Sequence, residues 1–391
     1  SSGKIMAYAS DALDTLYAQY NCIADETEVS RTGTDIEIGR DVKYLAIFMV
    51  GYADVAEFQL WSGDPSTKPE EPDEPDINSL KVLTIGNSFS ENTSIYASEI
   101  AKANGKSLTF GYLKFPSCKI EQHYQAAIEN LAVFKFQITD PDSNRTTIKN
   151  EAPRFDSPNP ETSATIVEAL EYTDWDVIVF QQESSSSLVA ASFEKLDELI
   201  EYVKGYCSDA KLAIHEVWSW GSWTNGEFDT MKANTYEAAK ANNLEIIPTG
   251  TAFEIARAEI RDYTALNDYD NGDYQHANAL GQYVAGACYV ATLFGIEVDS
   301  APFISHPDIN EHGNVQLLTD AVNEAVAERP IFGRAGDFNE DGYLRAEDLT
   351  VMRKALLGAE TVGNVNADVN EDSTFDIKDY IRLKKIIAGL A

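Results

Sequence analysis

Basic residues and long apolar runs are scarce in this chain of 391 residues. Thirty Lys and Arg stand against 64 Asp and Glu, which gives a formal net charge of −34. Because clustered cations bind phosphate backbones and anionic lipid surfaces, this composition argues against nucleic-acid binding and against docking on membranes. The longest apolar run, near residues 44–50, is far shorter than the ~20 residues that span a bilayer. We therefore expect no nucleic-acid partner and no membrane insertion.

Cysteine is also rare, and the four cysteines are scattered without a Cys-x-x-Cys pair. This spacing excludes a disulfide-dense scaffold and a zinc ribbon. We expect Cys22, Cys118, Cys207 and Cys288 to behave as small buried hydrophobic residues. The chain is rich in apolar bulk instead, since 44% of its residues are hydrophobic and 10% are aromatic, which is ample for a core.

A proline- and acid-rich segment over residues 62–78 divides the chain. It contains four prolines among six carboxylates, so we expect an extended spacer. Before it, residues 1–61 are rich in strand-like sequence, and residues 55–61 alternate apolar and polar side chains. After it, we expect one large domain over residues 79–330 and a C-terminal module over residues 335–391.

The large domain alternates strand-like with helix-like segments. Helices are expected at residues 93–104 and 192–206, and apolar residues recur at helical spacing between Leu280 and Ala291. Buried strands are expected at residues 81–85, 108–113, 175–180, 212–217 and 244–248. Such alternation predicts an α/β fold with a parallel sheet covered on both faces. Ligands bind these sheets at the carboxyl ends of the strands.

A serine nucleophile is predicted directly after the first of these strands, in the segment Gly86-Asn87-Ser88-Phe89. Ser88 would lie on a tight strand-to-helix turn, where free backbone N–H groups and the positive end of the helix can stabilise an oxyanion. The alternative is an ordinary N-cap of the following helix.

A serine nucleophile needs a base, and the chain has five histidines. In the segment Asp273-Tyr-Gln-His276 a carboxylate precedes an imidazole by three residues. This spacing lets Asp273 accept the Nδ1–H of His276 while Nε2 faces Ser88. The other histidines have no acid at this spacing and are expected to pack in the core or lie in loops: His123, His215, His306 and His312.

This arrangement resembles the SGNH/GDSL esterase superfamily over residues 80–298, and within it a branch of uncharacterised bacterial SGNH-like domains. The resemblance rests on four segments: Gly86–Phe89, Cys118–His123, Trp175–Gln182 and Asp273–His276. It implies a flavodoxin-like three-layer sandwich and a serine esterase that uses no cofactor for catalysis. Its catalytic residues would be Ser88, Asp273 and His276.

The chain departs from the superfamily pattern at the groups that hold the oxyanion. Asn87 stands where an Asp is usual, Pro116-Ser117-Cys118 stands where a glycine is usual, and Gln181-Gln182 replaces an Asn. We expect the donors to be the N–H of Ser88, an N–H of Ser117 or Cys118, and the amide of Gln182. Packing at the strand end is the alternative for the glutamines.

The C-terminal module contains a duplicated acidic loop. Side-chain oxygens fall at positions 1, 3, 5 and 12 of each loop, and position 7 offers a backbone carbonyl, which is the pattern of an EF-hand-type calcium cage. The expected ligands are Asp337, Asn339, Asp341, Tyr343 and Asp348 in the first loop, and Asp368, Asn370, Asp372, Thr374 and Asp379 in the second. Because these oxygens would repel one another without a cation, we expect one Ca²⁺ in each loop.

A predicted helix follows each loop, over residues 346–357 and 378–387. This loop–helix duplication resembles a type I dockerin. The resemblance implies a cohesin module of a scaffoldin as partner, and a secreted, extracellular cellulosome as location. The implied cohesin contacts, which could also be plain helix-start surface, are Ala346, Glu347, Ile377 and Lys378.

These patterns favour a secreted cellulosomal serine esterase that removes acyl groups, with acetyl expected, from plant cell-wall polysaccharide. Trp218, Trp220 and Trp223 are candidates to stack on sugar rings, with loop packing as the alternative. The competing interpretation is a catalytically inactive carbohydrate-binding or scaffold-docking protein with a degenerate SGNH-like domain. Hydrolysis of lipid or peptide acyl groups would need a wide apolar trough.

Residues 1–61 resemble the later half of a discoidin-like sandwich.

Overall fold

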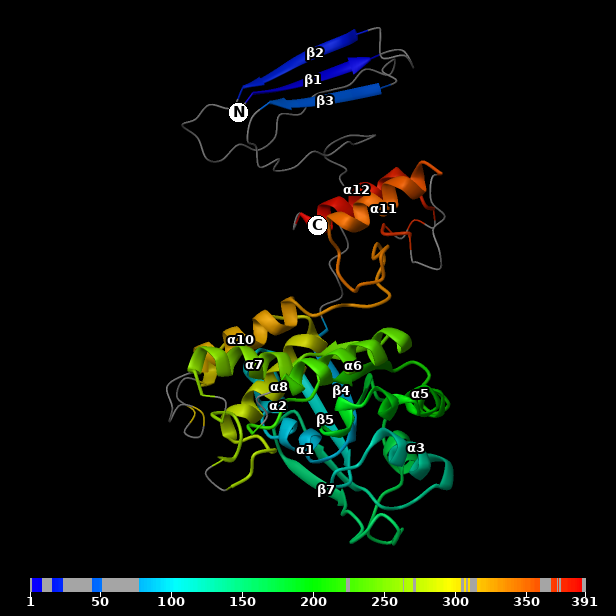
Figure 1. Cartoon of the computed structure of the whole chain (residues 1–391), viewed down its shortest axis with the longest axis vertical. Coiled ribbons are helices and arrows are strands. Elements are labelled where there is room, and N and C mark those ends of the chain that lie inside the picture. Colours follow the sequence, from blue (N-terminus) through cyan, green and yellow to red (C-terminus); the bar gives the residue numbers. More distant parts are fainter. Residues whose placement is uncertain are drawn as a thin grey trace. The chain divides into compact units, whose positions relative to one another are not determined.

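The computed structural model describes three strands of the first segment and most of the chain after it (Figure 1). The described residues are 2–8, 16–23, 44–50 and 77–388, the last range without 223–225, 263, 270–271, 304–305, 307–308, 310–314, 359–366, 371 and 373. The strand expected at residues 55–61 and most of the expected spacer lie outside them.

The first segment is a three-stranded antiparallel sheet of order β2-β1-β3. Its strands are β1 (Ser2–Tyr8), β2 (Leu16–Ile23) and β3 (Tyr44–Val50). The structure thus has strands where the sequence predicts a β-rich segment, and the discoidin-like resemblance stays a prediction.

A seven-stranded sheet of order β10-β9-β8-β4-β5-β6-β7 forms the centre of the large domain. Its strands are β4 (Ser79–Gly86), β5 (Ser107–Lys114), β6 (Lys135–Thr139), β7 (Arg145–Lys149), β8 (Val177–Phe180), β9 (Lys211–His215) and β10 (Glu245–Ile247). The five predicted strands are parallel, but β6 and β7 form an antiparallel edge hairpin. The predicted parallel sheet is therefore confirmed for its five strands, and the edge hairpin is an addition that the sequence pattern did not predict. The turn of this hairpin, at residues 140–144, has the sequence Asp-Pro-Asp-Ser-Asn, which is typical of turns.

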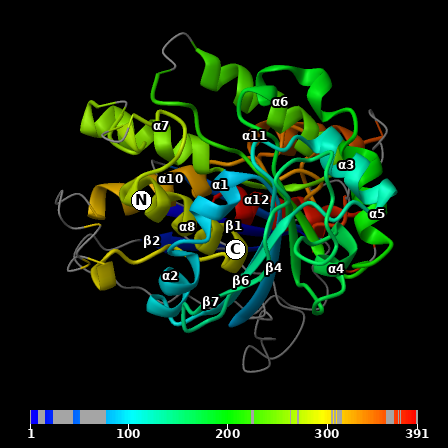
Figure 2. The ribbon, with the colours of Figure 1, turned by 90° about the horizontal axis from the view of Figure 1, so that it is seen from below.

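Apolar side chains of β4 contribute to two separate hydrophobic cores. Leu80 and Val82 belong to the core that packs α2 (Ala97–Ala103), α7 (Thr249–Ile260), α8 (Ala279–Phe294) and α10 (Val315–Ala327). Leu83 and Ile85 belong to the core that packs α3 (Ile120–Glu129), α4 (Ile166–Leu170) and α5 (Leu196–Lys204). Figure 2 shows these two groups of helices on either side of β4, as a three-layer sandwich requires. Helix α6 (Glu227–Asn242) packs beside β9 and β10.

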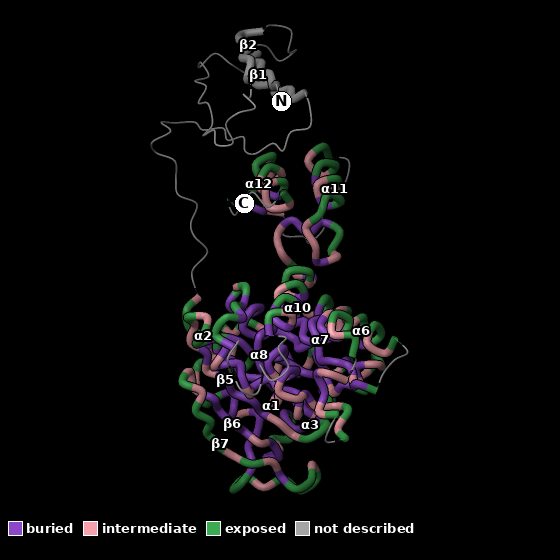
Figure 3. The backbone as a smooth tube through the Cα atoms, turned by 90° about the vertical axis from the view of Figure 1, so that its left-hand side faces the viewer, coloured by how far each residue is buried: buried purple, intermediate pink, exposed green. Residues whose placement is uncertain are grey.

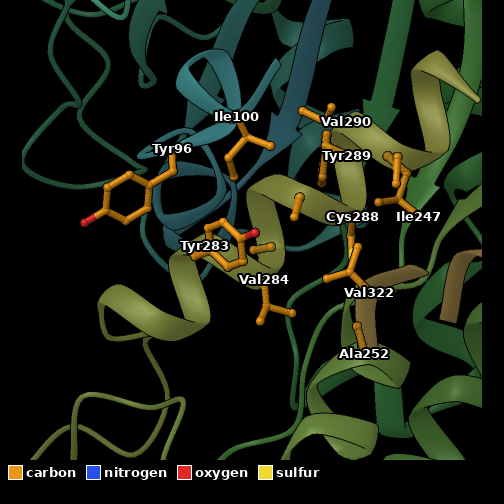
Figure 4. Close-up of a cluster of buried hydrophobic side chains, with 14 of the residues drawn as sticks. Tyr96, Ile100, Ile247, Ala252, Tyr283, Val284, Cys288, Tyr289, Val290 and Val322 are labelled. Carbon is orange, nitrogen blue, oxygen red and sulfur yellow. The ribbon is translucent and has the colours of Figure 1, made fainter. Parts of the chain in front are cut away.

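Helix α8 is the most deeply buried helix of the first core, and its ends follow from two residues. The Asn278 side chain accepts hydrogen bonds from the N–H groups of Leu280 and Gly281, which begins the helix. Gly295, at φ +64°, ends it in the left-handed conformation. Figure 3 shows α8 as a buried segment, and Figure 4 shows its Tyr283, Val284 and Cys288 among side chains from neighbouring elements.

The C-terminal module consists of two loops and two helices, α11 (Ala346–Leu356) and α12 (Ile377–Ile387), which pack on each other. Its small core contains Phe338 and Val369 from the loops and Met352 and Leu383 from the helices. Both helices lie within one residue of their predicted bounds. No helix of the described residues is long and apolar enough to cross a membrane.

Candidate active site

Ser88 is the first residue of α1 (Ser88–Thr93) and follows β4 almost immediately. Asn87 caps this helix, because its side-chain oxygen accepts the N–H of Phe89 at 3.0 Å. Asn87 and Phe89 are buried, whereas Ser88 is half-buried. The Ser88 N–H has no hydrogen-bond partner among the described residues. It is therefore available to a bound oxyanion.

Gln181 holds the turn that carries Ser88. Its Oε1 accepts hydrogen bonds from the N–H of Asn87 at 3.2 Å, the N–H of Ser90 at 3.1 Å and the Oγ of Ser90 at 2.6 Å. Its amide nitrogen donates to Asn87 Oδ1 at 2.7 Å. For Gln181 the sequence analysis names strand-end packing alone, so this positioning role was not predicted. Its location directly after β8, the strand next to β4, could have indicated the role.

His276 and Asp273 meet Ser88 across the sheet edge. His276 Nε2 lies 2.7 Å from Ser88 Oγ, and His276 Nδ1 lies 2.5 Å from Asp273 Oδ2. The second oxygen of Asp273 accepts the N–H groups of Gln275 and His276. Burial tends to raise the pKa of Asp273, but these hydrogen bonds, from the His276 N–H and ring foremost, lower the pKa overall. Asp273 is thus an anion that orients the imidazole.

Trp218 anchors the loop that carries His276. Its indole N–H donates to the carbonyl of Gln275 at 2.8 Å. Its ring stacks on Phe89 at 4.1 Å on one side and on Phe253 at 4.9 Å on the other. The prediction that Trp218 stacks on sugars is wrong, because this side chain is fully buried. It is a positioning residue that joins the serine turn to the histidine loop.

Trp220 does lie beside the histidine. It lines a hollow of about 420 Å³ together with Ser222, Gly272, Tyr274 and His276, which we call the Trp220 hollow. The Trp220 indole N–H donates to Ser184 Oγ at 2.7 Å, which fixes the ring. Trp223 lies outside the described residues.

Two expected oxyanion donors are already paired. The N–H of Cys118 donates to the carbonyl of Phe115 at 3.2 Å. The amide nitrogen of Gln182 donates to Ser192 O at 2.7 Å and to Ser192 Oγ at 3.1 Å. The structure therefore corrects the assignment of both groups. Ser117, exposed and at φ +53°, has an N–H without a partner among the described residues, so it is the donor left from that segment.

The remaining histidines are packing residues where the structure describes them. His123 lies 3.7 Å from Cys118 Sγ, and burial lowers the pKa of His123 to about 3 and raises the pKa of the Cys118 thiol. Burial also lowers the pKa of His215 to about 3. His306 packs on the rings of Tyr96 and Phe303. The segment that contains His312 is not described.

The two acidic loops of the C-terminal module share one hydrogen-bond pattern. In the first, Asp348 accepts the N–H of Phe338 at 2.9 Å and of Arg345 at 2.8 Å. In the second, Asp379 accepts the equivalent N–H groups, from Val369 at 2.9 Å and from Asp376 at 2.7 Å. The position-12 carboxylate thus closes both loops in the same way.

The first loop also brings acidic side chains near one another. Burial raises the pKa of Asp337, and the nearby carboxylates of Asp348 and Asp341 raise it further. Gly342, at φ +84°, makes the sharp turn at position 6. Among the described residues no group of three or more His, Cys, Asp or Glu side chains converges as a metal site, so Ca²⁺ in these loops stays a prediction. The four expected cohesin contacts are exposed: Ala346, Glu347, Ile377 and Lys378.

The fold and these contacts define an α/β protein with a serine, a histidine and an aspartate hydrogen-bonded in series at the carboxyl edge of a mostly parallel sheet. The strand order and the two cores on either face of the sheet give the three-layer arrangement in which these contacts lie. The chain belongs to the family described as "Domain of unknown function (DUF4886)", whose model matches residues 81–325. The model of the type I dockerin domain matches residues 335–388.

Several solved structures are similar to this chain. A DUF4886 family protein from Bacteroides uniformis is 24% identical, with a TM-score of 0.53, and the match covers 64% of this chain and 95% of that one. An acetyl xylan esterase is 11% identical over 53% of this chain and 96% of its own, with a TM-score of 0.34. A carbohydrate esterase family 3 protein from Talaromyces cellulolyticus is 12% identical over 55% and 97%, with a TM-score of 0.33. No curated protein matches.

Proposed function

We propose that the domain over residues 79–330 is a serine ester hydrolase that removes acyl groups, acetyl foremost, from polysaccharide. The observation that supports this most is the continuous series of contacts from Ser88 Oγ through His276 to Asp273, at 2.7 and 2.5 Å. Such a series is the nucleophile, base and orienting acid of a hydrolytic triad.

The mechanism follows from these groups. His276 Nε2 takes the Ser88 proton while Oγ attacks the ester carbonyl carbon, and the N–H groups of Ser88 and Ser117 stabilise the oxyanion. Asp273 stabilises the imidazolium. His276 then protonates the departing sugar oxygen, leaving an acyl-serine. Finally His276 removes a proton from water, whose oxygen attacks the acyl carbon, and returns that proton to Ser88.

The dockerin supports a polysaccharide as substrate and the outside of the cell as location. By its family it implies docking on a cohesin module of a cellulosome, where a plant cell-wall esterase meets its substrate. The exposed residues at the starts of α11 and α12 would contact the cohesin. The two acidic loops would each hold one Ca²⁺, through the side chains predicted above. The Trp220 hollow, with Trp220 and Tyr274 in its wall, offers aromatic surface beside the nucleophile.

Replacing the nucleophile tests the proposal. Ser88→Ala should lower kcat/KM on an aryl acetate by about 10⁴-fold or more, and the parent should release acetate from acetylated xylan or mannan. Ser208→Ala is a matched control, because it removes a hydroxyl at an exposed position before the start of β9, away from the carboxyl edge of the sheet. A Ser88→Ala chain as active as the parent would contradict the assignment.

The pairing of two expected oxyanion donors favours one alternative function, that of a non-catalytic carbohydrate-binding protein. With the Cys118 N–H and the Gln182 amide both paired, the oxyanion depends on backbone groups alone. A fluorophosphonate probe separates the two interpretations. It should label Ser88 of the parent chain in a hydrolase and leave the chain unmodified in a binding protein.

A further inference from the structure

A second hollow, of about 640 Å³, opens at the carboxyl edge of the sheet and takes no part in the triad. Phe115, Pro116, Lys135, Asn150 and Glu151 line it, and we call it the Asn150 hollow. Asn150 is exposed and Phe115 and Glu151 are half-buried, so a ligand from solvent can reach all three.

The strand register places this hollow close to the nucleophile. β4 pairs with β5 so that Gly86 lies opposite Lys114, and β5 pairs with β6 so that Lys114 lies opposite Lys135. Glu91, one helical turn after Ser88, joins the two places. Its carboxylate accepts hydrogen bonds from Lys114 at 2.6 Å and from Lys135 at 2.5 Å. The nucleophile helix is thus tied directly to the wall of the Asn150 hollow.

The two hollows lie on opposite sides of Ser88 along the sheet. The Trp220 hollow follows β9 and the Asn150 hollow follows β5 and β7, while Ser88 follows β4. In the sheet order β9-β8-β4-β5-β6-β7, β4 lies between them. An extended polymer that crosses the sheet edge can therefore occupy both hollows with Ser88 beneath its middle.

The wall of the Asn150 hollow combines polar groups with an aromatic ring and carries no excess of charge. Lys114 and Lys135 are balanced by Glu91 and by Glu151, whose carboxylate lies 3.9 Å from Lys114 Nζ. Sugar hydroxyls need donors and acceptors of this kind, and the Phe115 ring can cover an apolar sugar face. A polyanionic chain would gain no cationic partner here and would meet a protein of net charge −34.

We propose that the Asn150 hollow is a second substrate subsite, which binds the backbone of a neutral polysaccharide on the side of Ser88 away from Trp220. This inference rests on the proposed esterase function and names its substrate class: an acetylated neutral polymer of the xylan or mannan type. A uronic-acid polymer such as pectin is disfavoured.

Binding to a chain that cannot turn over tests the subsite without depending on catalysis. Calorimetry on the full chain carrying Ser88→Ala would use neutral xylo- and manno-oligosaccharides and an oligogalacturonide as probes. Adding Asn150→Ala with Glu151→Gln should weaken binding of the better neutral probe by about tenfold or more. The matched control is Glu171→Gln, because exposed Glu171 lies before the start of β8, at the opposite edge of the sheet.

The outcomes separate this inference from the esterase assignment. Weaker neutral-sugar binding in the Asn150/Glu151 variant, with the control unchanged, supports the subsite even if the parent hydrolyses no ester. Equal binding in both, tighter binding of the oligogalacturonide, or no binding of either neutral probe overturns the subsite, even if Ser88 reacts with a fluorophosphonate. Thermal unfolding of each variant shows whether a lost affinity comes from a lost fold.

Discussion

At the scale of single residues, Asp273 has the clearest task. Its two oxygens accept the Nδ1–H of His276 and the backbone N–H groups of Gln275 and His276. These contacts lower its pKa below the ordinary value despite partial burial. Because the pKa is lowered, Asp273 stays ionised above its ordinary pKa and loses its charge only when the pH falls through the lowered value. Its part in orienting His276 should therefore persist into mildly acidic solution.

Asp273→Asn should lower kcat/KM on an aryl acetate by about 10³–10⁴-fold, because an amide can hold the imidazole in the wrong tautomer. Steady-state kinetics at pH 7 and 8 would measure it. Asp262→Asn is the control, since Asp262 lies in the same loop region and contacts Thr264 instead of the triad. If Asp273→Asn retained full activity, another group would be orienting His276.

Glu91 gives a prediction about stability and pH. Burial would raise its pKa, but hydrogen bonds from Lys114 and Lys135, with the Lys114 charge and the Tyr112 hydroxyl, lower it to about 2. A lowered carboxyl pKa contributes stability that is complete above the ordinary value of 4.5 and is lost as the pH falls toward 2. Glu91→Gln should thus cost about 1–2 kcal/mol at pH 7.

The loss caused by Glu91→Gln should shrink between pH 4.5 and pH 2, where parent and variant converge. Thermal unfolding followed by tryptophan fluorescence at several pH values would measure the difference between them. Glu194→Gln, at an exposed position, serves as the control. A stability difference that is constant with pH would show that the Glu91 charge is unimportant.

At the scale of elements, the turn between β4 and α1 is what holds the nucleophile. It has room for Gln181 only because position 86 is glycine. A Cβ at Gly86 would lie 2.3 Å from Ser90 Oγ and 2.4 Å from Gln181 Oε1, both of which belong to the hydrogen-bonded clamp. Three segments therefore form this turn and hold it: the end of β4, the start of α1 and the end of β8.

Gly86→Ala should displace the Gln181 amide, lower kcat by about 10²-fold through a misplaced Ser88 and cost about 1–3 kcal/mol of stability. Kinetics and thermal unfolding on the same preparation would show both effects. Gly205→Ala, at the C-cap of α5 where the backbone is right-handed, should change stability by only about 0.5 kcal/mol. Unchanged kcat in Gly86→Ala would mean that the clamp does not position Ser88.

At the scale of the whole molecule, the α/β domain and the dockerin have different requirements. The proposed hydrolysis needs only side chains and backbone of the α/β domain, whereas the dockerin has a small core of Phe338, Met352, Val369 and Leu383. We expect a module with so little apolar burial to depend on bound ions for its stability. Cation binding should therefore control docking and leave ester hydrolysis untouched.

Chelation of Ca²⁺ should abolish binding to a cohesin and leave kcat/KM on an aryl acetate within about twofold of the untreated chain. Asp337→Asn should reproduce a partial loss, with calcium affinity lower by about tenfold. Glu340→Gln, at the non-ligand position 4, is the control. Cohesin binding that survives chelation would contradict the calcium cage, and a parallel loss of hydrolysis would contradict the independence of the two domains.

The sequence anticipated those parts of the molecule that are encoded over short distances. The buried strand before Gly86, the helix that ends at Gly295 and the repeated acidic loops each follow from periodicity or spacing within about a dozen residues. The edge hairpin of β6 and β7 was missed, because β7 carries exposed polar residues that show no buried-strand signal.

What the sequence alone determined is the local chemistry: a serine after a strand, an aspartate three residues ahead of a histidine, and two oxygen-rich loops. What only the tertiary structure decided is which groups meet. Ser88 and His276 are 188 residues apart in sequence, and their contact depends on strand order and on the packing of Trp218. The same holds for Gln181 and Gln182, whose partners come from other elements. A hydrogen bond depends on position and direction in space, and composition specifies neither.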